Sequence, residues 1–360
     1  MTRPGRRIIL RGLSIVLIII FAATLRLGWE WKQALDNVNA MTIPTVTLPE
    51  ITPTSHHQTN PVSQDIELQP TAIPATPVPT PDEPVNILLL GIDARIGEEV
   101  SRTDAIVVVR IDPQHNSVSM LSLPRDLWVD IPGYGKNKIN TAYPLGENDL
   151  GPGYGPALAK QTVSDLLDMP IHHFAMINFE GFQTLIDKLD GIEIDVPQEI
   201  YDDKYPVDEF EGDLRTMEVH FEAGTQMMDG ERALIYARTR HADSDFGRNQ
   251  RQQQVLLSIF NRVLDKDLFS QMTSLDDYTY ALRDYVRFDL SRSKMLSLAS
   301  IGPRLQTDHI QRYAIDSKMI TMVSSESDAF FVDPDELEQL VNDMVAVPSM
   351  SAGGESTVKR

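Results

Sequence analysis

Segments with strand periodicity and segments with helix periodicity alternate through most of this chain, from residue 85 to residue 345. The first, "VNILLLGIDAR" (85–95), is a continuous apolar run that ends in glycine, as expected for a buried strand followed by a tight turn. In "GPALAKQTVSDLLDM" (155–169), apolar residues recur every three or four positions, which is the pattern of an amphipathic helix. This alternation predicts an α/β fold with a mixed sheet between layers of helices.

The remaining elements follow from the same two patterns. The other predicted strands are 104–112, 117–131, 173–182, 192–196 and 310–315, and the other predicted helices are 182–191, 229–237, 248–266, 276–301 and 334–345. The acidic segment 201–219 is expected to be an exposed loop. "GYGKNKIN" (133–140) is expected to be a mobile hairpin tip rather than a phosphate loop, with Lys136 or Lys138 able to close over a ligand.

The N-terminal segment has the features of a membrane anchor. Arginines up to Arg11 precede the apolar run "GLSIVLIIIFAATL" (12–25), which lengthens to 8–29 if the flanking arginines extend outward. A transmembrane helix needs about 17–25 residues, and the positive-inside rule places residues 1–11 in the cytoplasm and the rest outside. A cleaved signal peptide is the alternative. Because no A-x-A site follows, we expect an uncleaved, single-pass signal anchor in the cell membrane.

Composition divides the rest of the chain. Proline and threonine dominate residues 40–84, which predicts an extended linker. A catalytic domain is expected over 85–265, an extension packed on it over 266–345, and a disordered tail over 346–360. The net charge of −20 over 360 residues argues against non-specific nucleic-acid binding, and the absence of cysteine excludes disulfides, thiolate metal sites and cysteine nucleophiles.

Charged side chains that could hold a ligand gather at predicted strand ends, where open α/β sheets assemble their sites, and in the stretch "YARTRHADSDFGRNQRQQQ" (236–254). They are Asp93, Arg102 and Asp104; Arg125 and Asp126; and Arg238, Arg240, Asp245, Arg248, Arg251 and Gln252. Surface ion pairs are the alternative for the third group. Its arginines exceed their local partners, however, and neutral amides stand where a solvated helix normally carries Glu and Lys, which favours a binding site.

Spacing within the third group suggests how its side chains are aimed. Arg238 and Arg240 are two apart, so in an extended segment both would point the same way. Arg248 and Gln252 are four apart, so on a helix they share a face. Asp245 comes just before that helix, where a carboxylate can cap free N–H groups or orient an arginine.

Several guanidinium groups together indicate a phosphate ligand. Planar guanidinium forks bind phosphate oxygens through paired hydrogen bonds and stay charged. A diphosphate usually also needs Mg²⁺ held by one or two carboxylates, for which Asp93 and Asp104 are the candidates. The sequence contains no Walker A motif and no G-x-S-x-G elbow, and its histidines lack metal-ligand spacing.

Five motifs in consistent order resemble the LytR-CpsA-Psr family, whose domain is also called the cell envelope-related transcriptional attenuator domain. They are "NILLLGID", "SRTDAIVVVRID", "SLPRDLWVDIPGYGKNKINTAY", "TVSDLLDMPIHHFAMINFEGFQTLIDKLDGIEIDV" and "GERALIYARTR…SDFGRNQRQQQVL". The resemblance covers about residues 85–265. Asp190 stands where the family usually has glycine.

The resemblance implies an α-β-α layered domain outside the membrane that transfers a glycopolymer from a polyprenyl diphosphate carrier to the cell wall, with peptidoglycan or another wall polymer as acceptor. It implies that Mg²⁺ is held by Asp93 and Asp104. It also implies that the diphosphate is bound by Arg102, Arg125, Arg238, Arg240, Arg248 and Gln252, with Asp245 orienting the arginines; of these, Asp93, Asp104, Arg125, Arg240 and Arg248 would be catalytic. An apolar channel for the lipid tail would be lined by Phe174, Met176, Ile177 and the 182–189 helix, although ordinary core packing explains these residues equally well.

Three other functions are alternatives to the transferase. A pyrophosphohydrolase would direct water instead of a sugar hydroxyl at the diphosphate. A non-catalytic envelope scaffold would bind the lipid carrier without reaction. A transcriptional attenuator would need a DNA-reading module in the cytoplasm, where only about ten residues precede the apolar run, and no helix-turn-helix pattern is present.

Overall fold

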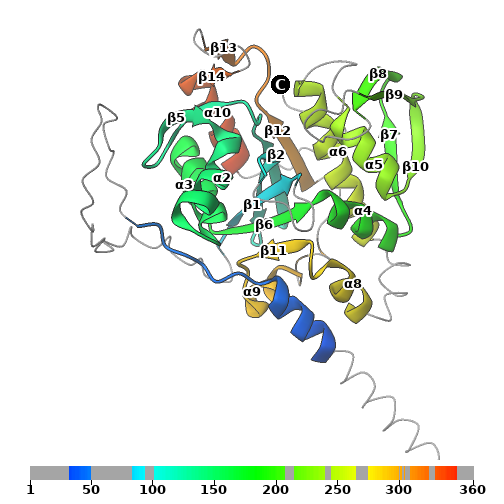
Figure 1. The fold of residues 1–360 in the computed structure, drawn as a ribbon, viewed down its shortest axis with the longest axis horizontal. Helices are drawn as coiled ribbons and strands as arrows, with labels where there is room; N and C mark the ends of the chain where they lie inside the picture. The colour runs from blue at the N-terminus through cyan, green and yellow to red at the C-terminus, as the bar shows by residue number, and fades with distance from the viewer. Residues whose placement is uncertain are drawn as a thin grey trace, which may run out of the picture.

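A six-stranded mixed sheet lies at the centre of the molecule in the order β11-β6-β1-β2-β3-β12 (Figure 1). The computed structural model describes residues 32–49, 83–93, 101–206, 215–239, 245–264, 275–299, 301, 304, 309–323 and 329–346. The strands of the sheet are β1 (Val85–Ile92), β2 (Thr103–Asp112), β3 (Ser117–Ser122), β6 (His173–Asn178), β11 (Val286–Phe288) and β12 (Ile310–Ala314).

The strand directions bring one set of strand ends to a common edge. β1 and β6 are parallel, so both end at this edge, whereas β2 is antiparallel to β1 and therefore begins there. The continuous apolar sequence of β1 is explained by its place inside the sheet, where Leu88 and Leu90 are buried. This edge is where the sequence predicted that charged residues would gather.

Helices cover both faces of the sheet, as the layered prediction requires (Figure 1). The helices on the two sides and at the sheet's ends are α2 (Ala142–Leu145), α3 (Tyr154–Leu167), α4 (Phe179–Lys188), α5 (Gly230–Arg238), α6 (Asp245–Leu264), α8 (Leu275–Leu282), α9 (Arg292–Ala299) and α10 (Pro334–Val345). On one face, α2, α3 and α10 enclose the largest apolar cluster, which includes Leu121, Leu158 and Leu337. On the other face, Leu257 and Phe260 of α6 pack against Val107 and Met120 of the sheet.

A second apolar cluster lies beyond α6, where α4 and α5 meet two small hairpin-like pairs of strands. The strands of this cluster are β7 (Ile192–Val196), β8 (Ile200–Pro206), β9 (Thr216–Phe221) and β10 (Gly224–Met228). Outside the cluster, the remaining short elements of the described chain are β4 (Trp128–Ile131), β5 (Gly135–Lys138), a 3₁₀ turn (Ile139–Thr141), a π-helical turn (Gly146–Leu150), β13 (Ile320–Met322) and β14 (Phe330–Val332). Ring packing between Phe221 and Tyr236, with centroids 5.1 Å apart, joins β9 to α5. The second cluster thereby fixes α4, α5 and α6 as a unit over the sheet.

Both edge strands of the central sheet come from the part of the chain that follows residue 265. β11 pairs with β6 and β12 pairs with β3. Just after β11, buried Asp289 accepts a hydrogen bond from Phe174 N (2.8 Å) and pairs with Lys160 Nζ (2.9 Å). Burial raises the pKa of Asp289, but hydrogen bonds from His173, Lys160 and Phe174 together lower it below its usual value. The segment predicted to pack on the domain as an extension is instead built into its sheet.

The N-terminal part that the structure describes also packs on this domain. A helix over residues 32–41 is followed by a segment in which Ile43 N donates to Phe288 O at 2.8 Å and Leu48 is buried in the main apolar cluster. Residues 41–49, the start of the extended linker predicted over 40–84, therefore pack on the domain. The predicted anchor, 8–29, and the predicted tail, 346–360 apart from Ala346, lie outside the described residues. Within the described ranges, none of the helices is both long and apolar enough to span a bilayer.

Some predicted boundaries are wrong for identifiable reasons. The strand predicted over 173–182 ends at Asn178, whose side chain accepts a hydrogen bond from Gly181 N (2.9 Å) and so starts α4 at Phe179. The strand predicted over 117–131 is broken by "LPRD" into β3 and β4. The acidic segment 201–219 contains paired strands β8 and β9 rather than only an exposed loop. Asp190 has a left-handed backbone (φ 56°), which explains why glycine suits this position and why aspartate is tolerated.

Candidate functional site

Asp104 occupies a β-bulge at the common sheet edge. Gly91 pairs with Ala105 and Ile92 pairs with Thr103, so Asp104 is an extra residue on β2 at the register shift. Bulges redirect side chains and recur beside active sites. Here the Asp104 carboxylate meets Arg125, whose Nη1 donates to Asp104 Oδ1 at 2.5 Å. The bulge therefore brings an acidic and a basic side chain from different strand ends into contact.

A small network holds Arg125 in place after β3. Its Nε lies 3.4 Å from Asp126 Oδ2, while Lys138 Nζ pairs with Asp126 Oδ1 at 3.0 Å. The Arg125 carbonyl accepts from Asn140 N (3.2 Å), which ties the loop to the 3₁₀ turn Ile139–Thr141 after the β4–β5 hairpin. Lys136 lies over the ring of Phe331, 5.1 Å from its centroid. In this structure both hairpin lysines are thus engaged with the protein rather than positioned over the site.

Arg238, the last residue of α5, lies between two aromatic rings. Its guanidinium carbon is 4.4 Å from the centroid of Phe179 and 5.9 Å from that of Tyr205. Cation–π contacts of this kind contribute about 0.5–1 kcal/mol each and fix the plane of the guanidinium. Because Arg238 is helical, the prediction that it shares an extended segment with Arg240 is wrong for this residue.

The amide-rich sequence of α6 serves two purposes. Arg248 and Gln252 share the face that lines the cavity described below, as their spacing predicts. The other face is structural: buried Arg251 donates from Nε to Tyr236 O (3.1 Å) and from Nη2 to Thr239 O. The neighbouring amides reach backbone carbonyls of distant strands: Gln253 Nε2 donates to Tyr313 O (2.5 Å), and Gln254 Nε2 donates to Asp195 O.

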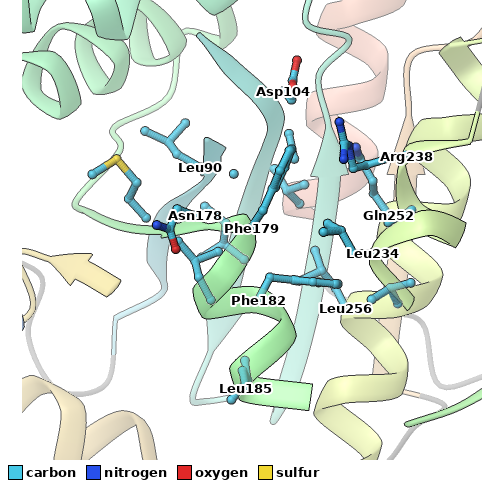
Figure 2. A pocket seen from close by; sticks show the side chains of 18 of the residues that line it. Leu90, Asp104, Asn178, Phe179, Phe182, Leu185, Leu234, Arg238, Gln252 and Leu256 are labelled. Atoms are coloured by element: carbon cyan, nitrogen blue, oxygen red, sulfur yellow. The ribbon is translucent and has the colours of Figure 1, made fainter. Parts of the chain in front are cut away.

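A cavity of about 380 Å³ runs from this charged edge between the sheet and helices α4, α5 and α6. Figure 2 shows Asp104 and Arg238 at one end, Phe179 and Leu234 between, and Phe182, Leu256 and Leu185 toward the other end. The polar and charged lining residues are Asp104, Arg125, Asn178, Asp202, Arg238, Arg248 and Gln252. The apolar lining residues include Leu89, Leu90, Val107, Phe182, Leu185, Leu234, Val255, Leu256, Leu282 and Val286. The cavity is therefore amphipathic, with a charged mouth and an apolar interior.

Comparison with known proteins identifies the family. Residues 47–346 match the LytR_cpsA_psr family along most of the chain. The chain belongs to the LytR-CpsA-Psr family.

Its relatives include enzymes of envelope assembly. The polyisoprenyl-teichoic acid–peptidoglycan teichoic acid transferase TagU of Oceanobacillus iheyensis is 38% identical over 216 residues, which are 59% of this chain and 61% of that protein. The chain thus matches about three fifths of the length of this curated relative. Among solved structures, TagV of B. subtilis has a TM-score of 0.57 and 27% identity, covering 73% of this chain and 98% of TagV. TagT bound to LI-WTA has a TM-score of 0.54 and 25% identity, covering 75% and 94% of the two chains.

The structure brings together some of the residues that the LytR-CpsA-Psr resemblance selects. Asp104, Arg125, Arg238, Arg248 and Gln252 all line the cavity. Of the predicted apolar channel, Met176 and Ile177 line the cavity, as do Phe182 and Leu185 of the predicted 182–189 helix. Phe174 does not line it and packs in the main apolar core, with 4% of its surface exposed.

Other predicted residues take different positions. Asp93 directly follows β1 and is half-buried, but it is not among the residues that line the cavity. Arg102 is exposed and lines a second, smaller cavity. Arg240 and the side chain of Asp245 lie outside the described residues, although Asp245 is the first residue of α6.

Among the cavity residues that sequence reasoning missed are the polar and aromatic side chains of Asn178, Phe179, Asp202 and Tyr205. Asp202 of β8 is 1% exposed, and Tyr205 of the same strand is also buried. The acidic composition around them suggested a solvated loop and hid the alternation of buried Ile200 and Asp202. Asn178 and Phe179 stand at the strand–helix junction, which the sequence analysis placed inside a strand. The N-cap pattern, asparagine three residues before Gly181, was the available signal.

Proposed function

We propose that this protein transfers a glycopolymer from a polyprenyl diphosphate carrier to a cell-wall acceptor such as peptidoglycan. The observation that supports this most directly is the amphipathic cavity, in which arginines from three separate chain segments surround the mouth of an apolar interior. A lipid diphosphate has the same polarity: an anionic head and an apolar tail. The relatives named as teichoic acid transferases and TagT bound to LI-WTA support the same class of substrate.

The tail and the head would be bound by different forces. Burial of each methylene of the prenyl tail among Phe182, Leu185 and Leu256 would contribute about 0.8 kcal/mol. Arg238 and Arg248 would bind the diphosphate oxygens through charge-assisted hydrogen bonds, whose planar geometry matches phosphate. The tail would supply most of the affinity, and the arginines would set the position of the reacting phosphorus.

The reaction is a phosphoryl transfer. The oxygen of an acceptor hydroxyl would attack the phosphorus next to the sugar, and the bond from that phosphorus to the bridging oxygen would break. Polyprenyl phosphate would leave, and the glycan would remain on the acceptor through a phosphodiester. Arg125, Arg238 and Arg248 would neutralise the charge that develops on the phosphoryl oxygens, which is the main catalytic task in such reactions. Asp93 or Asp104 would accept the hydroxyl proton.

The residues at the mouth fit a magnesium ion that is shared with the substrate. Mg²⁺ is usually bound through one or two carboxylates together with substrate phosphates. Among the described residues no group of three or more acidic or histidine side chains could hold a metal alone. Asp104 at the cavity and Asp93 after β1 would therefore hold the ion together with the diphosphate. When bound, it would add positive charge beside the phosphoryl oxygens.

The proposed reaction takes place outside the cytoplasmic membrane. The lipid carrier is confined to a bilayer, so the enzyme needs to reach that surface. The basic and apolar sequence of residues 1–29 supports a single-pass anchor with a cytoplasmic N-terminus. The residues that follow this anchor would then lie on the extracytoplasmic side, with the bilayer as a partner and no nucleic acid involved.

The test is a transfer assay with the full chain, a polyprenyl-diphosphate glycan, Mg²⁺ and peptidoglycan. We expect glycan to become attached to peptidoglycan. We expect Asp104→Ala, Arg240→Ala and Arg248→Ala each to lose at least tenfold in rate, since a lost transition-state contact typically costs about 2.7–4 kcal/mol. Arg232→Ala, which removes an exposed arginine on α5 outside the cavity lining, is the matched control and should retain activity.

Three other results would redirect the proposal. Release of the glycan only into solution would identify a pyrophosphohydrolase. Full transfer by the Asp104, Arg240 and Arg248 variants would show that these side chains do not serve the reaction, and lipid binding without any reaction would favour a scaffold.

A further inference from the structure

A second cavity, of about 290 Å³, lies beside the charged edge of the sheet. Its lining residues are Arg102, Asn137, Thr141, Pro144, Leu145, Asn148 and Asp149. We propose that this second cavity binds a saccharide unit of the acceptor glycan, and this inference rests on the proposed transferase function.

The second cavity is placed next to the residue at which the reaction would occur. Arg102, on its rim, is two residues before Asp104, which lines the first cavity. Between them, Thr103 is buried, and its Oγ1 lies 3.5 Å from Asn140 O in the 3₁₀ turn whose Thr141 lines the second cavity. The start of β2 is thus shared by the walls of both cavities. A ligand in the second cavity would approach the Asp104 side of the diphosphate site.

The lining chemistry fits a neutral polyhydroxylated ligand. Arg102 contributes one positive charge and Asp149 one negative charge, so the lining has no net charge and an anionic group would gain little. Asn148 provides both amide donors and an acceptor, and Asn137, whose Oδ1 also accepts from Lys138 N at 2.8 Å, adds further amide donors, which is what sugar hydroxyls require. Pro144 and Leu145 add an apolar surface for the C–H face of a pyranose ring. A phosphate site, like the first cavity, would have several arginines instead.

The polar side chains project from a rigid support. Asn148 and Asp149 lie in the π-helical turn Gly146–Leu150, and π-helical segments recur at functional sites. Glu147 in the same turn accepts hydrogen bonds from Gly153 N (3.0 Å) and Gly155 N (2.9 Å), which fastens the turn to the start of α3. At Gly146 an added Cβ would lie 2.6 Å from Tyr154 O, so the two backbones pack in direct contact.

Tyr134 lies beside Asp149, and its Oη donates to Leu145 O at 3.5 Å. Burial, followed by the charge of Asp149 and a hydrogen bond to its carboxylate, raises the pKa of Tyr134. Asn148 and Asp149 are exposed and are not part of the apolar core, and the turn that carries them is fastened to the start of α3. A rigid support of this kind lowers the entropic cost of binding.

The experiment measures binding of an uncharged glycan to the full chain in detergent micelles. The probe is an N-acetylglucosamine tetrasaccharide, titrated calorimetrically against the wild type and the Asn148→Ala/Asp149→Asn double variant. Both side chains are exposed, so the variant should fold normally, as its melting curve would verify. We expect its affinity to be about tenfold weaker, or about 1.4 kcal/mol. Glu338→Gln, an exposed charge change on α10, is the control and should bind like the wild type.

The outcomes separate this inference from the proposed function. Weaker tetrasaccharide binding by the double variant, with unchanged binding of the lipid diphosphate, supports a glycan site in the second cavity. Absence of tetrasaccharide binding to the wild type, or equal binding by wild type and double variant, overturns the inference even if the transfer assay succeeds. Specific tetrasaccharide binding in a protein that does not transfer glycan would instead refute the transferase function and leave the glycan site standing.

Discussion

Arg251 is expected to stabilise the fold rather than act on substrate, although it is three residues from Arg248 on the same helix. It is 5% exposed and donates to two carbonyls, Tyr236 O and Thr239 O, at the C-terminal end of α5. A hydrogen bond from a charged donor contributes about 1.5–3 kcal/mol. Removing both in Arg251→Ala should lower the free energy of unfolding by about 3–5 kcal/mol, because the carbonyls lose their partner and stay buried.

The assay is thermal unfolding followed by circular dichroism. For a domain of this size each kcal/mol corresponds to about 2–4 °C, so Tm should fall by ~6–20 °C. Arg262→Ala is the matched control, since Arg262 is only half-buried and its Nε donates to Leu189 O at 2.9 Å. Its expected loss is about 1 kcal/mol. A Tm for Arg251→Ala within about 2 °C of the wild type would show that these bonds do not hold α5 and α6 together.

Three further predictions concern the sheet edge, the cavity and pH. Gly91→Ala should lower Tm slightly and reduce transfer, because the new Cβ would lie 3.0 Å from Ala105 Cβ beside the bulge, which transfer assays and melting curves would detect. Leu256→Trp should weaken binding of a long-chain prenyl diphosphate while a short-chain analogue still binds, because the larger ring fills the apolar interior; equal losses for both lipids would contradict this. Burial, followed by nearby positive charges, lowers the pKa of His172 to about 4, so the folded protein keeps it neutral and stability should decrease as pH falls from about 6.5 toward 4. His172→Asn, which retains an acceptor for Asn86 N, should flatten this decrease in melting curves at pH 7 and pH 5.

The sequence predicted the order of elements well because their patterns are local. The continuous apolar run of β1 and the helical spacing of α3 reflect the immediate environment of each segment. The order of the six strands could not be predicted from the sequence, because β12 pairs with β3 across a long stretch of chain. Nor did any local signal show that β11 would cover the opposite edge.

At the site, local spacing succeeded for one face of α6 and failed for the other. Arg248 and Gln252 lie together at the cavity because four residues make about one helical turn. The roles of Arg251 and Gln253 depend on carbonyls that other segments supply. Two arginines of the same helix therefore have different roles, because Arg248 lines the cavity and Arg251 is structural. Asp202 was missed for the related reason that burial of a carboxylate is decided by tertiary contacts.

The origin of the two outer strands has a consequence for how the chain reaches its native state during synthesis. β1, β2, β3 and β6 are complete when residue 178 has been made, but β6 and β3 acquire their outer neighbours only with residues 286–288 and 310–314. Until then the nascent sheet presents unpaired N–H and C=O groups along both borders, and such borders recruit other chains. A polypeptide that stops at residue 265 would retain the arginines of α6 yet be expected to aggregate.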